Sequence, residues 1–244
     1  MGALLAALAL AAAGVGGPQA ETSIHQLTPV QLAGQRIIAG YRGYKPPPEL
    51  RRRIRRGEVG GVILFRRNVK SRDQVADVIE RLQAVPRPHD VDEPLLVMVD
   101  QEGGSVVRIP GAPRRSAADV GASGSERAAR ATGRAAGRTL RAARVNVNLA
   151  PVVDVARNGS AMQRERRAYG TDALGTPATA PYGSAAQVAV LAARAGVDLM
   201  LYSSYATGEA ATRRVARAIR GGRVRRDEAE ASLRRLIELR HSLR

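Results

Sequence analysis

The sequence predicts an α/β fold built on a parallel β-sheet. Short apolar runs without polar alternation, such as residues 95–99, are typical of strands that are covered on both faces. Helical patterns separate these runs, and such an alternation of helix and strand is that of a parallel sheet with crossover helices. The 244 residues, 44% of them hydrophobic, are sufficient for one domain with a buried core.

The first 20 residues indicate an export signal. An Ala/Leu-rich run ends in Gly, Pro and small residues, as in the hydrophobic region and cleavage site of a secretory signal peptide. A basic start is missing, which a signal anchor or a misassigned start codon also explains. The run is short and Gly-rich for a membrane span. We therefore expect a domain over residues 21–244 that is secreted or associated with the cell envelope.

Five segments have the pattern of strands, and helical patterns lie between them. The predicted strands are 36–39, 61–65, 95–100, 145–155 and 197–202. A short helix is predicted to begin at Thr28 and Pro29, and a second one, with Leu50 and Ile54 buried, to end at Gly57. Five further predicted helices cover residues 71–83, 126–144, 185–195, 207–220 and 226–243. Asp227 with Glu230 predicts a capping box for the last helix. Five strands are too few to close an eight-stranded barrel.

Composition excludes several classes of site. Without cysteine the chain has no disulfide, thiol nucleophile or thiolate metal site. His25, His89 and His241 have no second ligand nearby in the sequence, so we expect solvated histidines, no metal and no cofactor. The net charge of +17 favours anionic surroundings such as wall polymers. Aromatic residues are only 3% of the chain, which argues against a base-stacking platform and specific nucleic-acid binding.

The candidate site follows the strand at residues 95–99. Asp100 and Glu102 stand at its carboxyl end, where ligands bind in open α/β sheets and in (β/α)₈ barrels. Gly103 and Gly104 permit a sharp turn, and Arg108 can return to the same place. A helix cap or a partner for a nearby arginine is an equally good interpretation of these carboxylates from spacing alone.

The string VDQEGGSVVR resembles the VDQEGGxVxR signature of family 3 glycoside hydrolases, in particular the bacterial β-N-acetylhexosaminidase branch that trims peptidoglycan sugars. The resemblance implies a (β/α)₈ TIM-barrel-like fold in which Asp100 and Arg108 bind hydroxyls of an N-acetylglucosamine ring. RAYG resembles the family motif RSFG, whose arginine, here Arg167, contacts the sugar. NVNLAPVVDV resembles the fourth barrel strand, where Asp154 is either a carboxylate at the barrel mouth or a buried, arginine-bonded one.

The resemblance to the family is interrupted near residues 170–171. Members continue with a KHFPGHGD-like loop that supplies a histidine acid/base and with a TDD- or TDAL-like strand end that supplies the aspartate nucleophile. Here no histidine lies between His89 and His241, and TDAL follows RAYG directly. Asp172 belongs either to the tail of the RSFG-like motif or to the nucleophile strand. We predict an internal loss, an incomplete barrel with about five of eight strands, and self-association through its open edges.

The leading functional hypothesis is a retaining hydrolase of O-glycosyl bonds, β-N-acetylhexosaminidase-like and impaired in activity. The resemblance implies Asp100, Arg108 and Arg167 as substrate-binding residues and Asp172 as a candidate catalytic nucleophile. The alternative is a non-catalytic, basic remnant that binds carbohydrate or the cell wall. Nucleic-acid binding, supported by charge alone, ranks last.

Overall fold

The computed structural model describes residues 7–8, 24–151, 158–167, 185–194, 197–202 and 204–243. The chain divides into two compact units. The first comprises Met1–Ile63, Arg81–Leu96 and Thr179–Arg244, and the second comprises Leu64–Glu80 and Val97–Ala178. Each unit is described by itself.

Three parallel strands form the centre of the first unit. They are β2 (Ile37–Gly40), β3 (Gly61–Leu64, of which Leu64 falls in the second unit) and β8 (Leu199–Tyr202). Ile38 lies opposite Gly61 on one side and opposite Leu201 on the other. The two residues of β1 (Ala7–Leu8) pair with β8 in antiparallel fashion. Every residue of β2, β3 and β8 is buried, as the unbroken apolar runs predict.

The second unit has one parallel pair and one hairpin. Strand β4 (Leu96–Val99), whose first residue belongs to the first unit, pairs with β7 (Val147–Asn148). The hairpin consists of β5 (Gln101–Gly103) and β6 (Val106–Val107). Of the strand predicted over residues 145–155, residues 145–151 are described and only β7 among them is strand; residues 152–155 lie outside the described residues. Leu149 still donates its N–H to the Val99 carbonyl at 2.9 Å, but Pro151 has no N–H with which to extend a ladder.

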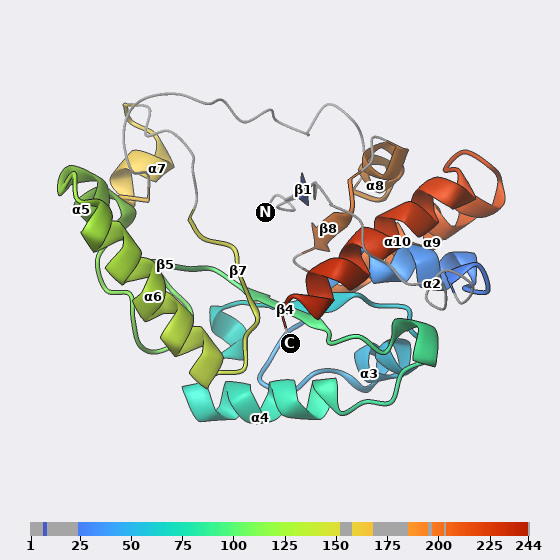
Figure 1. The fold of residues 1–244 in the computed structure, drawn as a ribbon, viewed down its shortest axis with the longest axis horizontal. Helices are drawn as coiled ribbons and strands as arrows, with labels where there is room; N and C mark the ends of the chain where they lie inside the picture. Colours follow the sequence, from blue (N-terminus) through green and yellow to red (C-terminus); the bar gives the residue numbers. More distant parts are fainter. Residues whose placement is uncertain are drawn as a thin grey trace. The chain divides into compact units, whose positions relative to one another are not determined.

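Helices cover the strands of the first unit. They are α2 (Pro29–Gln35), α3 (Pro48–Arg55), α8 (Ala185–Arg194), α9 (Tyr205–Arg220) and α10 (Arg226–His241), with a 3₁₀ turn η2 (His89–Val91). Figure 1 shows α2, α9 and α10 side by side. Thr28 caps α2 in a capping box with Gln31, so the predicted helix start is confirmed.

The predicted capping box of the last helix is wrong. Arg225 occupies the N-cap position of α10 without a side-chain bond. Glu230 is 3% exposed, and its carboxylate instead binds Arg226 at 2.8 Å and His25 at 2.6 Å. A buried carboxylate that is bound by an arginine and a histidine cannot also reach back to the helix start, and sequence spacing does not reveal these partners.

The helices of the second unit are α5 (Ala117–Ala122), α6 (Glu126–Ala142), α7 (Ala161–Arg164) and most of α4 (Arg72–Gln83), with a 3₁₀ turn η1 (Arg66–Asn68). The sequence predicts a loop over residues 109–125, but α5 lies inside this segment and begins with a capping box between Ser116 and Asp119. The sequence also predicts that Gly133 and Gly137 let the helix over residues 126–144 lie close to a neighbour. At Gly133 this is wrong, because a Cβ there would meet no described atom within 4 Å.

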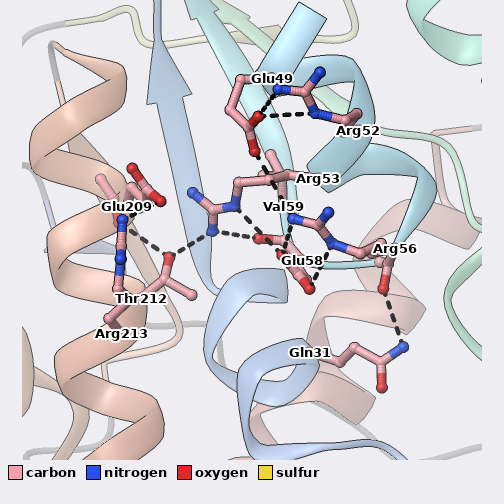
Figure 2. A network of polar contacts seen from close by, with 12 residues as sticks. Gln31, Glu49, Arg52, Arg53, Arg56, Glu58, Val59, Glu209, Thr212 and Arg213 are labelled. Carbon is pink, nitrogen blue, oxygen red and sulfur yellow. Dashed lines mark hydrogen bonds and ion pairs between the residues drawn. The ribbon is translucent and has the colours of Figure 1, made fainter.

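A polar network in the first unit explains part of the arginine-rich composition (Figure 2). Arg53 of α3 is 3% exposed, unlike its neighbours in the arginine run, which was predicted to be solvated. Its guanidinium donates to the Glu58 carbonyl at 2.8 Å and to Thr212 Oγ1 of α9 at 3.0 Å, and it lies 5.7 Å from the centre of the Tyr205 ring. Arg53, which lies in the arginine-rich stretch of residues 51–56, is therefore buried and links α3 to α9 through its hydrogen bond to Thr212.

The predicted α/β class is confirmed, and all five predicted strands are present. No helix among the described residues combines the length and the apolar composition that crossing a membrane requires.

Candidate active site

The hairpin after β4 builds the candidate site in the second unit. Asp100 follows the last residue of β4, and the turn between β5 and β6 brings the chain back to Arg108. Pairing shifts register between Gln101 and Gly103, as in a β-bulge. Gly103 has a φ of +99°, and a Cβ there would lie 2.1 Å from the Arg115 carbonyl oxygen. Glycine is therefore required at this turn.

Gln101 fixes the segment that carries Arg108. It is 1% exposed, and its amide nitrogen donates to the carbonyls of Ile109 and Ala112, both at 2.9 Å. Its side-chain oxygen accepts the backbone N–H groups of Arg108 and Ile109, both at 3.0 Å. Both donors and both acceptor positions of the side chain are thus used. The glutamine is a structural template for the loop.

Asp100 lies in the electrostatic field of the predicted sugar-binding residues. Partial burial raises the pKa of its carboxyl above the ordinary value. The positive charge of Arg108 opposes this rise in pKa, the negative charge of Glu102 adds to it, and the positive charge of Arg167 opposes it. Asp100, Arg108 and Arg167, the three substrate-binding residues expected from the sequence, all belong to the second unit, and the charges of both arginines act on the Asp100 carboxyl. The Nε atom of Arg108 is buried and has no hydrogen-bond partner in the described part of the chain.

Glu102 binds Arg167 in a bidentate ion pair. Arg167 Nε lies 3.0 Å from Glu102 Oε2, and Arg167 Nη2 lies 2.7 Å from Oε1. The Glu102 side chain is 4% exposed and the Arg167 side chain 27%. The bond to Glu102 is the main reason why the pKa of Arg167 is raised. From the sequence, Glu102 was either a carboxylate of the site or a partner for a nearby arginine, and the pair with Arg167 shows that the second interpretation is correct.

Two asparagines join β7 to β4. Asn146 Oδ1 accepts the Val97 N–H at 2.7 Å, and Asn148 Oδ1 accepts the Gln101 N–H at 3.0 Å. The side chains of the NVN motif therefore extend the strand pairing up to the site. Nothing in their spacing alone distinguishes such asparagines from ligand-binding ones.

A cavity of about 480 Å³ in the second unit includes Glu102 in its lining. This volume is in the range of small-molecule pockets. The lining is mostly apolar, and its other residues are the following: Gln101, Pro113, Val120, Ala129, Thr132, Gly133, Ala136, Asn148, Ala150 and Pro151. Gly133 leaves room here, which is a use of this glycine other than the predicted close packing.

The structure does not join the other predicted residues to the site. Asp172 and Asp154 are outside the described residues. His89 is 97% exposed, whereas His25 pairs with Glu230 and His241 with Glu93. The described residues contain no group of three His, Cys, Asp or Glu side chains placed to hold a metal ion.

Comparison with known proteins identifies the family. The family model described as "Glycosyl hydrolase family 3 N terminal domain" matches residues 20–181. The chain belongs to glycosyl hydrolase family 3. This match includes Asp100, Arg108 and Arg167, and it confirms the resemblance that the sequence motifs indicated.

Curated relatives in family 3 are longer than this chain. An uncharacterized secreted glycosyl hydrolase of Arthroderma benhamiae is 37% identical over 57% of this chain and 40% of its own length. β-Hexosaminidase A of Pseudoalteromonas piscicida is 33% identical over 54% of this chain and 26% of its own length. A β-hexosaminidase of Xanthomonas campestris pv. campestris is 36% identical over 52% of this chain and 39% of its own length. The chain spans less than half the length of these relatives.

Solved structures share the fold. A family 3 β-N-acetylglucosaminidase from Paenibacillus sp. has a TM-score of 0.73 at 21% identity, covering 89% of this chain and 63% of its own. A β-N-acetylhexosaminidase from Beutenbergia cavernae has a TM-score of 0.73 at 20% identity, and the match covers 88% of this chain and 99% of that protein. These likenesses confirm the predicted fold, a partial TIM-barrel-like arrangement.

Proposed function

We propose that this protein hydrolyses O-glycosyl bonds of β-linked N-acetylglucosamine, as a β-N-acetylhexosaminidase-like member of family 3 in carbohydrate or peptidoglycan metabolism. The observation that carries the proposal is the arrangement at the end of β4, where Asp100 follows the strand, the β5–β6 hairpin returns to Arg108, and Glu102 binds Arg167 at 2.7 Å. A carboxylate and guanidinium donors in one region suit a sugar, whose hydroxyls both donate and accept hydrogen bonds. The names of the relatives agree with this substrate class.

Each of the three residues has a distinct binding role in this proposal. The Asp100 carboxylate accepts hydrogen bonds from sugar hydroxyls. Arg108 donates from its guanidinium, whose Nε lacks a protein partner among the described residues. Arg167, held by Glu102, donates from the edge of its guanidinium that Glu102 leaves open.

Retaining hydrolysis needs a carboxylate nucleophile and an acid/base. We assign the nucleophile to Asp172 from its TDAL motif. No histidine lies between His89 and His241 to protonate the leaving oxygen. Loss of general acid help costs about 10² to 10⁴ in rate. We therefore expect slow turnover that depends on a good leaving group.

A second candidate is a non-catalytic protein that binds carbohydrate or the cell wall. It is favoured by the same missing histidine together with the net charge of +17, which attracts anionic wall polymers. Export suits both candidates, since residues 1–20 resemble a signal peptide and one relative is described as secreted. Self-association through unpaired strand edges also suits both.

Two measurements on the full chain separate the candidates. Binding of N-acetylglucosamine is followed by NMR titration, and hydrolysis is assayed with an aryl β-N-acetylglucosaminide, which needs little acid help. Binding with slow hydrolysis supports the hydrolase, whereas binding without hydrolysis supports the second candidate. Arg108→Ala should abolish binding, and the exposed Arg130→Ala, paired only with Glu126, should not. Absence of any binding by the parent chain would overturn both.

A further inference from the structure

The ion pair between Glu102 and Arg167 occupies the edge of the guanidinium that binds anions best. Arginine recognises carboxylates and phosphates through two parallel N–H donors. In this site the Nε and Nη2 donors of Arg167 are both directed at the Glu102 carboxylate, at 3.0 and 2.7 Å. An incoming anion cannot use that pair of donors without displacing a carboxylate whose side chain is 4% exposed.

The donors that remain on Arg167 are few. A guanidinium has five N–H groups, of which the pair with Glu102 uses two. Nη1 donates a third, at 3.4 Å, to Glu165 Oε2. The described residues leave two N–H groups for a ligand, and the positive charge of the guanidinium is already offset by Glu102. Arg167 can therefore donate hydrogen bonds to a ligand, but its positive charge is already neutralised by Glu102.

The described charges around Arg167 nearly balance, in contrast to the net charge of the whole chain. Three carboxylates, Asp100, Glu102 and Glu165, accompany two guanidiniums, those of Arg108 and Arg167. The chain as a whole carries +17. Charges that are partly buried are screened less by salt than exposed ones, so the carboxylates act on a ligand at short range while the distant surface cations are screened.

We propose that Glu102 is a positioning residue that determines specificity: by neutralising Arg167 and fixing its free edge, it makes the site accept a neutral sugar and reject an anionic one. This inference rests on the proposed function, because it requires that a sugar binds beside Arg167. It adds a discrimination among sugars that a pair serving only to stabilise the hairpin would not produce.

The chain offers a closely matched control for this pair. Asp198 binds Arg235 in the first unit with Nε–Oδ2 and Nη2–Oδ1 distances of 3.0 and 2.6 Å. The side chains are 1% and 29% exposed, close to the 4% and 27% of Glu102 and Arg167. Asp198→Asn and Glu102→Gln therefore remove the same kind of buried charge, but only Glu102→Gln does so at the candidate site.

The test compares the affinity for neutral and anionic sugars in the full chain. Dissociation constants are measured by calorimetry or NMR for N-acetylglucosamine, N-acetylglucosamine 6-phosphate and N-acetylmuramic acid, which carry no charge, a phosphate and a carboxylate. We expect the parent chain to bind the neutral sugar at least about tenfold more tightly than either anion. Glu102→Gln should reduce that ratio about tenfold, and Asp198→Asn should leave it unchanged.

Three outcomes would overturn the inference. In folded Glu102→Gln protein, an unchanged ratio, or an equal loss of affinity for all three sugars, would assign Glu102 a structural role only. If Glu102→Gln does not fold, the test rests on the ratio of affinities for neutral and anionic sugars in the parent chain. Equal affinity of the parent chain for neutral and anionic sugars would contradict the proposal. A parent chain that binds none of the sugars would refute the proposed function itself, a result distinct from binding without discrimination.

Discussion

Gln101 holds Arg108 by its backbone: the side-chain oxygen of Gln101 accepts the Arg108 N–H at 3.0 Å, while its amide nitrogen binds two carbonyls farther along the same loop. A polar residue between Asp100 and Glu102 could have been assigned to substrate binding. Its complete burial and full set of hydrogen bonds instead make it the support on which Arg108 is placed.

Gln101→Leu should therefore reduce both stability and sugar affinity. The substitution leaves two buried N–H and two carbonyl groups without their partner, so we expect a loss of about 2–4 kcal/mol in the free energy of unfolding. Urea unfolding measures this loss, and NMR titration measures the affinity for N-acetylglucosamine.

Gln83→Leu is the control for Gln101→Leu. Gln83 makes two side-chain bonds to the backbone of Leu95, both at 2.9 Å, in the first unit. It should cost about half as much stability and leave the sugar affinity unchanged. Equal losses of sugar affinity in the two variants would mean that Gln101 acts through general stability alone.

The fold could be predicted to a large extent because its signals are local. Unbroken apolar runs located β2, β3 and β8, and Thr28 with Pro29 marked the start of α2. The errors occurred where tertiary contacts override local preference. Glu230 is taken by Arg226 and His25, and Arg53 is drawn into the interior by Thr212, 159 residues away.

For the candidate site, the sequence predicted which residues take part but not the hydrogen bonds and ion pairs that position them. Family motifs identified Asp100, Arg108 and Arg167 as candidates. The template role of Gln101 was missed, and the arginine that pairs with Glu102 could not be named, because their partners lie 7 to 65 residues away in the sequence. No local pattern specifies such pairings.

Asp100→Asn should stabilise the fold at neutral pH. Desolvation raises the pKa of Asp100 in the folded state, so the folded protein binds a proton more readily than the unfolded chain. The stability penalty is absent below the ordinary value of 3.8, develops as the pH rises through the higher folded pKa, and is constant above it. The substitution removes this penalty while it removes the sugar's acceptor.

Urea unfolding of the parent and Asp100→Asn between about pH 3 and pH 7 checks this sign, because the model-peptide aspartate titrates near 4. The stability difference should favour the variant increasingly as the pH rises. Sugar binding should be lost in the variant throughout the range. A variant that is less stable than the parent at pH 7 would show that Asp100 contributes to the fold through its charge.

Arg53→Met should destabilise the first unit by about 2–4 kcal/mol, because Glu58 and Thr212 lose a buried charged donor. Arg51→Met, on the exposed face of the same helix, should change the free energy of unfolding by less than about 0.5 kcal/mol. Chemical denaturation measures both. Similar values for the two variants would contradict the network shown in Figure 2.

Binding to anionic polymers should be weak and without sequence preference. The net charge of +17 comes from arginines spread along the chain, and several are already paired, as Arg130 is with Glu126. Retention on polyphosphate and on DNA should fall together as salt increases from about 0.05 to 0.2 M. Tight binding to one DNA sequence that persisted at high salt would restore the nucleic-acid hypothesis.

The most direct test of the proposed function is the hydrolysis of p-nitrophenyl N-acetyl-β-D-glucosaminide by the full chain and by Asp172→Asn. A complete active site commonly turns over at about 10 s⁻¹. The aryl leaving group needs little acid help, but water must still be activated to hydrolyse the glycosyl-enzyme, and loss of that base help costs about 10² to 10⁴ in rate. The predicted result is turnover at or below about 0.1 s⁻¹ that Asp172→Asn abolishes while binding of N-acetylglucosamine persists. Turnover near 10 s⁻¹, or activity that survives Asp172→Asn, would contradict it.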